Sequence, residues 1–212
     1  MDSLAKEQAI KEQLVERGIT SPKVIKVFRE IPREDFLPKG KESLAWYDGP
    51  VEIDHQSTIS QPYIVALMTQ LLALDGSEKV LEVGTGSGYQ AAILSKLAKK
   101  IHSIDVKPEL TADAKDRAKK LGLENIVFLS GDGSAGYPEA APYDAIVVTA
   151  GSPKIPQPLI AQLKVGGRMV IPIGDELSQS LQLVTRREKD IEVRVLDQVR
   201  FVPLLGRYAW RQ

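Results

Sequence analysis

Three glycines and a carboxylate follow one another closely in the segment VLEVGTGSGY, residues 80–89. Apolar residues lead into Glu82, and Gly84, Gly86 and Gly88 then occur at every second position. Glycines in a turn between a strand and a helix let backbone N–H groups and the helix N-terminus approach a ligand closely, because no Cβ stands in the way. The segment therefore predicts a binding site for a nucleotide-like cofactor, with a tight turn that binds nothing as the alternative.

The glycine spacing separates two classes of cofactor. The dinucleotide fingerprint is Gly-x-Gly-x-x-Gly, in which the third glycine allows a helix to pack closely on a strand. Tyr89 occupies that third position in this chain, which disfavours a nicotinamide dehydrogenase. The pattern Glu-x-Gly-x-Gly-x-Gly instead resembles the first motif of methyltransferases that use S-adenosylmethionine and have a Rossmann-like sheet. This resemblance implies that Glu82 and the turn residues bind the cofactor, the latter being Gly84, Thr85, Gly86, Ser87 and Gly88.

A second carboxylate, Asp105, ends the apolar stretch 101–105. In nucleotide-binding folds a carboxylate at the end of the second strand accepts hydrogen bonds from the ribose hydroxyls, so we interpret Asp105 as a ribose ligand. Capping of the helix that Pro108 opens is its alternative role.

A third carboxylate, Asp132, lies between Gly131 and Gly133 after the apolar stretch 126–130. The resemblance implies that these three residues contact the cofactor and that Asp132 faces the adenine amino group. An ordinary Asp-Gly turn is the alternative interpretation.

The composition excludes several kinds of site. The chain has 212 residues, with 28 Lys and Arg against 28 Asp and Glu. A chain of zero net charge lacks the basic excess that gives affinity for phosphates, so we expect no nucleic acid partner. The absence of cysteine excludes disulfides, thiolate metal sites and a cysteine nucleophile. With only His55 and His102 we expect no metal, and we interpret both histidines as structural.

No apolar run approaches the length of a membrane span, and the N-terminal segment is amphipathic and charged. We therefore expect no membrane association, no secretory signal and a cytoplasmic location. We also expect a monomer. Because 43% of the residues are hydrophobic and can bury a core, we expect a single methyltransferase domain over residues 1–212.

The order of elements predicts an α/β fold. Apolar strands are expected at 79–83, 101–105, 126–130, 143–149 and 168–172, with amphipathic helices between them. Continuous apolar strands of this kind form a parallel sheet covered by helices on both faces. We predict a Rossmann-like, doubly wound, mostly parallel sheet with an N-terminal helical extension. A C-terminal antiparallel strand pair, 181–185 and 191–203, is expected to end the sheet.

Three parts of the domain follow from this order. Residues 1–60 carry two helices, the first ending near Gly18 and the second opening at Pro22, and then a long loop over 32–60 without sustained periodicity. Loops of that length in compact domains are often functional, so we expect a substrate loop here. Residues 61–175 form the cofactor-binding core, and residues 176–212 form the C-terminal strands.

Several segments together are more specific than a fold class. They are TISQPY at 58–63, residues 80–93, GDG at 131–133, APYDAIVVTA at 141–150 with IPQ at 155–157, GGR at 166–168 and VRFVPL at 199–204. In this combination the chain resembles the protein-L-isoaspartate O-methyltransferase family over roughly residues 45–205. The resemblance implies methyl esterification of the free α-carboxylate of L-isoaspartyl residues in damaged proteins and peptides, which starts their repair. S-adenosyl-L-methionine would be the cofactor, and S-adenosyl-L-homocysteine the product.

The resemblance also assigns roles to individual residues. Ser60 is the implied active-site serine, Thr58 and Thr149 are implied cofactor ligands, and Ile59 lies with Ser60 at the substrate. A carboxylic acid with a reference pKa of about 4 is already ionised at neutral pH, so no catalytic base is needed. Our hypothesis is that the Ser60 hydroxyl, with neighbouring N–H groups, holds the attacking carboxylate in line. A plain helix N-cap before Pro62 is the alternative.

The C-terminal end offers a further substrate contact. Exposed backbone near Val202 is expected to pair with an extended peptide by strand addition, which reads main chain more than side chains. The alternative is that Phe201, Val202, Leu204 and Leu205 only close the hydrophobic core.

One segment departs from the family pattern. Before Thr58 the family commonly reads Ile-Gly-x-Gly-Gln, whereas this chain reads IDHQS at 53–57. Loss of two glycines removes positions that tolerate positive φ, which could reshape the substrate loop. A methyltransferase with a different small-molecule or protein substrate is therefore the alternative function, and a nonenzymatic adaptor with this fold is a third.

Overall fold

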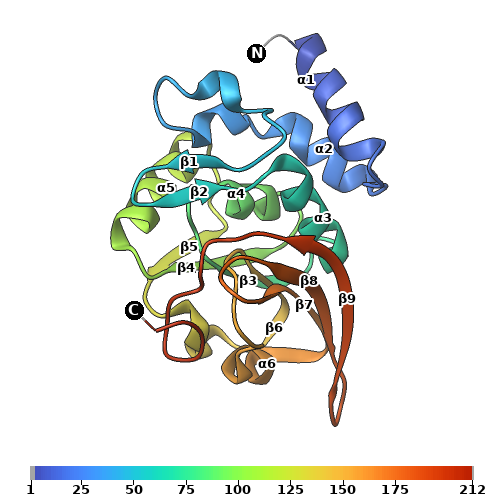
Figure 1. Cartoon of the computed structure of the whole chain (residues 1–212), viewed down its shortest axis with the longest axis vertical. Coiled ribbons are helices and arrows are strands. Elements are labelled where there is room, and N and C mark those ends of the chain that lie inside the picture. The colour runs from blue at the N-terminus through green and yellow to red at the C-terminus, as the bar shows by residue number, and fades with distance from the viewer. Residues whose placement is uncertain (1–2, 212) are drawn as a thin grey trace.

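The computed structural model describes residues 3–211, so Met1, Asp2 and Gln212 of the predicted domain lie outside the described part. Its main sheet has seven strands in the order β5-β4-β3-β6-β7-β8-β9. The strands are β3 (Lys79–Val83), β4 (Lys100–Asp105), β5 (Ile126–Ser130), β6 (Tyr143–Val148), β7 (Leu163–Gly174), β8 (Gln179–Arg186) and β9 (Ile191–Val199). The first five are parallel and the last two are antiparallel, so the predicted α/β sheet with a C-terminal antiparallel pair is confirmed (Figure 1).

Helices cover both faces of this sheet. The α-helices are α1 (Ser3–Ile10), α2 (Pro22–Glu30), α3 (Pro62–Leu72), α4 (Tyr89–Ser95), α5 (Pro108–Lys120) and α6 (Gln157–Gln162), and α1 continues into a π-helical turn, η1 (Lys11–Val15). Side chains of α3 and α4 pack on one face, where Met68 and Leu94 meet Val80. Leu159 of α6 packs on the other face with Leu81. Adjacent residues of β3 therefore enter opposite cores, as expected for a sheet buried on both sides.

The N-terminal helices form a further layer. Val24, Val27 and Phe28 of α2 lie inward and join a hydrophobic cluster with α3 and α4. Ser21 caps α2 by accepting a hydrogen bond from the Val24 N–H. Figure 1 shows α1 and α2 together at the end of the molecule far from the β8–β9 turn. The extension is thus packed on the core rather than separate from it.

The long loop predicted over 32–60 contains regular structure, which is a correction. Two 3-10 helices, η2 (Arg33–Phe36) and η3 (Glu42–Leu44), precede an antiparallel hairpin of β1 (Val51–Ile53) and β2 (Ser57–Ile59). The signal was hidden because the strands are only three residues long. In addition, His55 and Gln56 in the turn have φ of 58° and 52°. Glycine at such positions is the usual sequence signal for a hairpin turn, and it is absent here.

Several strand boundaries also differ from the predicted ones, and the last strand, β9, ends at Val199 rather than at residue 203. β6 ends at Val148, one residue before Thr149, and β7 is much longer than 168–172. β7 begins at the end of α6 and pairs with β8 as far as Gly174, so the antiparallel part of the sheet starts at β7. Further short 3-10 helices, η4 (Gly133–Ala135) and η5 (Pro138–Ala140), lie between β5 and β6.

The strand order reverses beside β3. From β3 the chain first adds β4 and β5 on one side and then returns to place β6 on the other. In open α/β sheets, ligands bind at the carboxyl ends of the strands where this reversal occurs. The carboxyl ends of β3, β4 and β6 therefore mark the expected site.

Candidate active site

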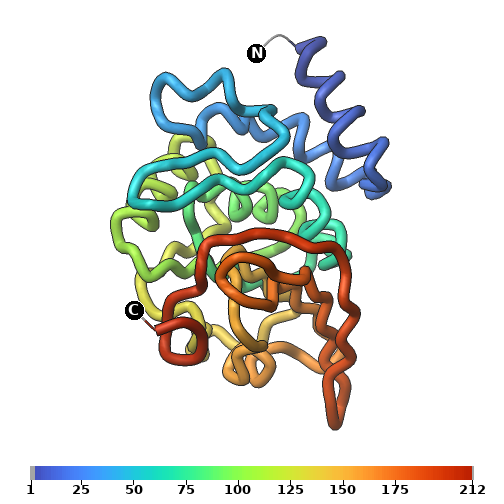
Figure 2. Tube along the Cα trace, in the orientation of Figure 1, coloured from blue at the N-terminus to red at the C-terminus, as the bar shows by residue number. Residues whose placement is uncertain are grey.

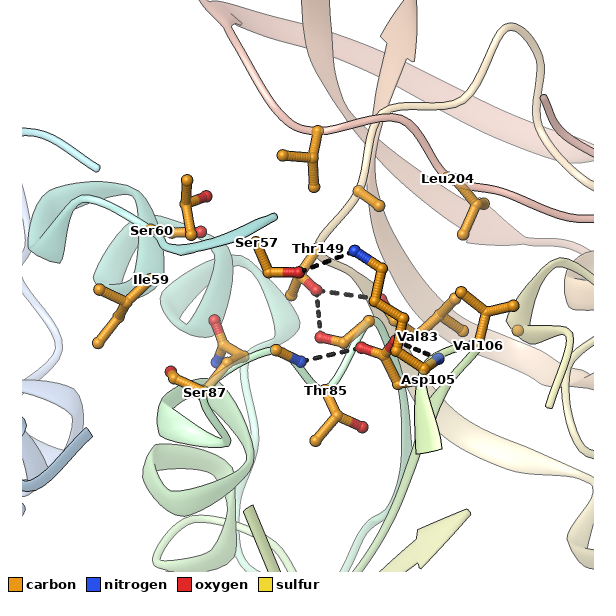
Figure 3. A pocket seen from close by; sticks show the side chains of 18 of the residues that line it. Ser57, Ile59, Ser60, Val83, Thr85, Ser87, Asp105, Val106, Thr149 and Leu204 are labelled. Carbon is orange, nitrogen blue, oxygen red and sulfur yellow. Dashed lines mark hydrogen bonds between the residues drawn. The ribbon is translucent and has the colours of Figure 1, made fainter. Parts of the chain in front are cut away.

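A pocket opens at that position. It is lined by residues 83–87 with Tyr89 and Gln90, by residues 104–107, Gly133, Thr149 and Ala150, by residues 56–60 with Val65 and Met68, and by residues 202–205. We call residues 83–90 and 104–107 the glycine wall, residues 56–60 the hairpin wall and residues 202–205 the C-terminal segment. Figure 2 shows the hairpin in cyan and the C-terminal segment in red crossing the same region of the molecule, and Figure 3 shows the lining side chains. Three segments distant in the chain thus enclose one cavity.

The glycine wall is a tight turn from β3 into α4. Gly84 has φ 99°, and a Cβ on it would collide with the Thr149 hydroxyl. That hydroxyl donates to the backbone carbonyls of Val83 and Gly84, at 3.1 and 2.5 Å, and so fastens the turn to the end of β6. A Cβ on Gly88 would lie 2.8 Å from the Cβ of Ala114 in α5. The glycines therefore bring backbone close to neighbouring elements, and Gly84 has space for no larger residue.

Asp105 holds the turn from the neighbouring strand. Its two carboxylate oxygens accept from the N–H groups of Gly86 and Lys107, each at 3.0 Å (Figure 3). The helix-cap alternative is wrong, because Lys107 is the N-cap residue of α5 and no side chain caps that helix. A carboxylate oxygen has room for a second hydrogen bond, so Asp105 can accept from a ligand in the pocket while it keeps its backbone partners.

Glu82 lies behind the turn rather than in the pocket wall. It is fully buried, and its Oε2 accepts from the Ser103 hydroxyl at 2.5 Å, while Ser103 in turn lies 2.7 Å from the Thr85 hydroxyl. Burial raises the pKa of Glu82 to about 8, and the nearby Asp105 carboxylate adds to this, whereas the Ser103 hydrogen bond opposes it. Glu82 thus contacts the turn through Ser103 and Thr85.

Ser60 lies in the hairpin wall with Thr58 and Ile59. The N-cap alternative is wrong, because the N-cap residue of α3 is Gln61, and no side chain makes a capping hydrogen bond to this helix. The Ser60 hydroxyl makes no hydrogen bond to any other residue in the described part of the chain, although Ser60 lines the pocket. A hydroxyl in this position can donate to a bound group.

The other predicted residues divide between the pocket and its surroundings. Gly133 and Val202 line the pocket, whereas Gly88, Gly131 and Asp132 do not. Asp132 caps η4 by accepting from Ser134 N–H at 2.9 Å and from its hydroxyl at 2.6 Å. Its second oxygen accepts from the N–H of Arg207 at 2.8 Å. These bonds favour the turn interpretation, and they also attach the end of the chain to β5.

The C-terminal segment is held at its start as well. The Gly151 N–H donates to the carbonyl of Val202 at 2.8 Å, and Leu204 N–H donates to the Gly151 carbonyl at 2.7 Å. Val202 keeps 38% of its surface exposed, while Phe201 and Leu204 are buried. Phe201 and Leu204 therefore close the core, while Val202 is presented to the pocket. Pairing of this segment with a peptide stays a prediction.

Sequence reasoning missed Lys107. Its Nζ donates to the His55 carbonyl at the hairpin turn and lies 3.4 Å from the Ser57 hydroxyl. The lysine thereby joins the glycine wall to the hairpin wall. No local pattern signals such a contact, because its acceptor is a backbone carbonyl 52 residues away in the chain.

The two histidines occupy different settings. His102 is buried in β4, with its ring centroid 5.8 Å from those of Tyr137 and Tyr143, and burial lowers its pKa. His55 is exposed at the hairpin turn. Within residues 3–211, no cluster of three or more potential metal-ligating side chains occurs, and no helix is both long and apolar enough to cross a bilayer.

Comparison with known proteins gives a consistent result. The family model described as Protein-L-isoaspartate(D-aspartate) O-methyltransferase (PCMT) matches residues 5–209. A Syntrophobacter fumaroxidans protein named Protein-L-isoaspartate O-methyltransferase 1 is 48% identical over 206 residues, covering 97% of this chain and 96% of the relative.

Two solved structures are also similar to this chain. A structure named protein-L-isoaspartate O-methyltransferase superposes with a TM-score of 0.87 at 32% identity, covering 96% of this chain and 67% of the other. A Plasmodium falciparum protein in complex with S-adenosyl-L-homocysteine superposes with a TM-score of 0.81 at 24% identity, covering 94% of this chain and 98% of the other, which shows a shared fold.

Proposed function

Since the chain belongs to the protein-L-isoaspartate(D-aspartate) O-methyltransferase family, we propose that it transfers a methyl group from S-adenosyl-L-methionine to the free α-carboxylate of L-isoaspartyl residues in damaged proteins and peptides. The observation that carries this proposal is the pocket itself. It combines a glycine turn and Asp105 on one wall with the unbonded hydroxyl of Ser60 on another. This arrangement suits a nucleoside cofactor on one side and an anionic acceptor on the other.

The glycine wall fits S-adenosyl-L-methionine. A Cβ on Gly84 would collide with Thr149, so the backbone of the turn lies close to the residue that follows β6. The pocket that both residues line is the space for the cofactor. Asp105 would hold the ribose hydroxyls, with Gly84, Thr85, Gly86, Ser87 and Thr149 around the rest of the cofactor, and Glu82 supporting them from behind. The proposed cofactor role of Asp132, with Gly131, rests on the resemblance alone, because its carboxylate is bonded to Ser134 and Arg207.

The hairpin wall is proposed to hold the substrate. When bound, S-adenosyl-L-methionine would supply an electrophilic methyl group. A carboxylate oxygen of the substrate would form the new O–CH3 bond as the S–CH3 bond breaks, which gives a methyl ester and a neutral thioether. Ser60 donates a hydrogen bond to the carboxylate and holds it in line, with Ile59 beside it at the substrate. Thr58, in the same wall, is proposed to contact the cofactor. Well-oriented intramolecular reactions indicate that such positioning is worth roughly 7–11 kcal/mol. No protein base acts, because the acceptor is already ionised at neutral pH.

The C-terminal segment is proposed to contact the peptide backbone. Gly151 already pairs with Val202 and Leu204 on one side. Proline at position 203 has no N–H, so a peptide on the other side would find the Pro203 carbonyl as its acceptor. Strand addition here would therefore be short, which suits an enzyme that tolerates different sequences around the damaged residue.

Four finer statements are part of the proposal. The protein acts as a monomer in the cytoplasm, without nucleic acid, and residues 1–212 form one domain. The balance of 28 basic and 28 acidic residues supports the absence of a nucleic acid partner. The packing of α2 against α3 and α4 supports a single domain made of residues 1–60, 61–175 and 176–212.

Transfer of labelled methyl groups to matched peptides tests the function. The two peptides differ only in carrying isoaspartyl or normal aspartyl, and the product is scored as a base-labile ester. Labelling of the isoaspartyl peptide alone is expected. If the protein binds S-adenosyl-L-homocysteine by calorimetry but labels neither peptide, the altered 54–57 loop has changed the substrate and the proposal fails.

A further inference from the structure

A buried arginine lies directly behind the hairpin wall. Arg33, in η2, has no exposed surface, although its side chain carries a charge. Arginine is among the residues least often fully buried, because removing a guanidinium from water costs several kcal/mol unless it is well partnered. Among residues 3–211, no carboxylate lies within ion-pairing distance of it. The partners of Arg33 therefore need to be identified among neutral groups.

Those partners are two backbone carbonyls and one aromatic ring. Arg33 Nε donates to the Ala45 carbonyl and Arg33 Nη2 donates to the Ser60 carbonyl, each at 2.7 Å. The guanidinium carbon lies 4.8 Å from the ring centroid of Tyr89, a favourable cation–π arrangement. Burial lowers the pKa of Arg33, but a guanidinium with so high a reference value stays charged. One side chain thus connects three separate segments.

Two of these three segments, those of Ser60 and Tyr89, line the pocket. The Ser60 carbonyl is in the peptide unit between Ser60 and Gln61, immediately before α3 begins. Tyr89 is the first residue of α4 and lines the pocket from the glycine wall. Phe28 and Phe36 pack edge-on against the Tyr89 ring, with centroids 6.0 and 5.3 Å away, so the ring that supports Arg33 is itself fixed.

We propose that Arg33 is a positioning residue that fixes the Ser60 peptide unit, and with it the Ser60 hydroxyl, relative to the glycine wall. The inference rests on the proposed function of Ser60. A guanidinium is planar and holds its donors in a rigid fork, so two bonds to two carbonyls fix both the distance and the angle between them. Lysine, with a single ammonium on a flexible stem, cannot reproduce that geometry. The high cost of burial is consistent with a role in orientation rather than in stability.

A double-mutant cycle tests this role. Arg33→Lys is expected to lower kcat for the isoaspartyl peptide about 10- to 100-fold, because a misplacement of about 1 Å can cost this much. The affinity for S-adenosyl-L-homocysteine, measured by calorimetry, should change less than about threefold, since Arg33 does not line the pocket. In the Ser60→Ala background the same Arg33→Lys change should lower kcat less than about threefold, because the group that it positions is gone.

Arg186 provides a matched control. It also donates to backbone carbonyls, those of Ile160 and Ala161 at the end of α6, at 3.1 and 2.9 Å, but it does not line the pocket. Arg186→Lys should leave kcat near the wild-type value. Arg33→Met, an apolar variant of similar length, replaces Arg33→Lys if the lysine variant does not fold.

Amide hydrogen exchange gives a readout that does not depend on activity. Peptides covering residues 58–64 should exchange faster in the Arg33 variant than in wild type, and no such change is expected in Arg186→Lys. The proposal is overturned if exchange there is unchanged, if Arg33→Lys retains its full effect on kcat in Ser60→Ala, or if cofactor affinity falls in parallel with kcat. Failure of the wild-type protein to label isoaspartyl peptide would instead reject the proposed function, and the exchange result would still decide the role of Arg33.

Discussion

The glycine wall and the hairpin wall enclose the same pocket but differ in what holds them. The glycine wall is a turn that continues a central strand of the sheet, and Asp105 and Thr149, at the ends of the two neighbouring strands, fasten it. The hairpin wall lies outside the main sheet and is fixed by two long side chains, Arg33 and Lys107, which donate to its backbone carbonyls. The first wall is therefore built into the sheet, whereas the second depends on side chains that reach it from other segments. Substitutions in the two walls should have separable effects.

The largest effect is expected from Ser60→Ala in the hairpin wall. Loss of one oriented donor at a reacting group typically costs about 10²- to 10³-fold in kcat. Binding of S-adenosyl-L-homocysteine should be unchanged within about twofold, since Ser60 lies outside the glycine wall. Steady-state kinetics and calorimetry measure the two quantities. Normal turnover in this variant would remove the functional distinction between the walls.

Gly84→Ala is the corresponding test of the glycine wall. Strain at positive φ costs about 1–2 kcal/mol, and overpacking against Thr149 adds about 1–3 kcal/mol. We expect the free energy of unfolding to fall by about 2–5 kcal/mol and cofactor affinity to fall with it. Gly76→Ala is the control, because Gly76 also has positive φ but nothing lies within 4 Å of the place that its new methyl group would occupy. Equal losses in both variants, by urea unfolding, would show that close packing at Gly84 is unimportant.

The third test concerns the acid behind the glycine wall. The pKa of Glu82 is about 8 in the folded protein against a reference of 4.5, so the folded state binds more protons than the unfolded state between these values. Stability should therefore fall as pH rises from 4.5 to 8, by up to about 1.4 kcal/mol per pH unit.

Glu82→Gln should remove this contribution. The free energy of unfolding should then depend less on pH between 4.5 and 8, and it should exceed the wild-type value at pH 8. Urea unfolding at about pH 5, 6.5 and 8 measures the slope. Glu109→Gln, at an exposed position in the first turn of α5, serves as the control and should keep the wild-type slope. An unchanged slope in Glu82→Gln would show that Glu82 does not govern it.

The smallest effect is expected where the two walls meet. Lys107→Met removes the bond to the His55 carbonyl, and a hydrogen bond of this kind contributes about 0.5–1.5 kcal/mol. Hydrogen exchange in residues 51–57 should increase, with at most a few-fold rise in KM for the peptide. Lys96→Met, on an exposed lysine at the end of α4, should change neither quantity. A large loss of cofactor affinity in Lys107→Met would show that the walls are not separable.

Adjacency of signals in the chain explains which elements the sequence could predict. The strand, glycine turn and helix at 79–95 were recognisable because strand, turn and helix signals are adjacent in the chain. The hairpin at 51–59 was not, since the turn residues His55 and Gln56 adopt positive φ without being glycine. Arg33 and Lys107 gave no signal at all, because each acts on a backbone carbonyl, and any residue supplies one.

For Asp132, the sequence predicted the position of the side chain correctly but not its hydrogen-bond partners. Its position after β5 is the predicted one, yet its carboxylate receives hydrogen bonds from Ser134 and from the distant Arg207. A motif can therefore locate a side chain correctly and leave its contacts undetermined, since these depend on segments that the motif does not include.

The C-terminal segment is attached at Gly151, and the residues that follow it are attached as well, Arg207 to Asp132 and Tyr208 to the Ser134 hydroxyl. A segment secured in this way has little freedom to withdraw, so the width of the entrance on that side should be the same for every incoming peptide. Tolerance for bulky neighbours of the damaged residue would then have to come from the hairpin, whose turn is held to the glycine wall by a single flexible lysine.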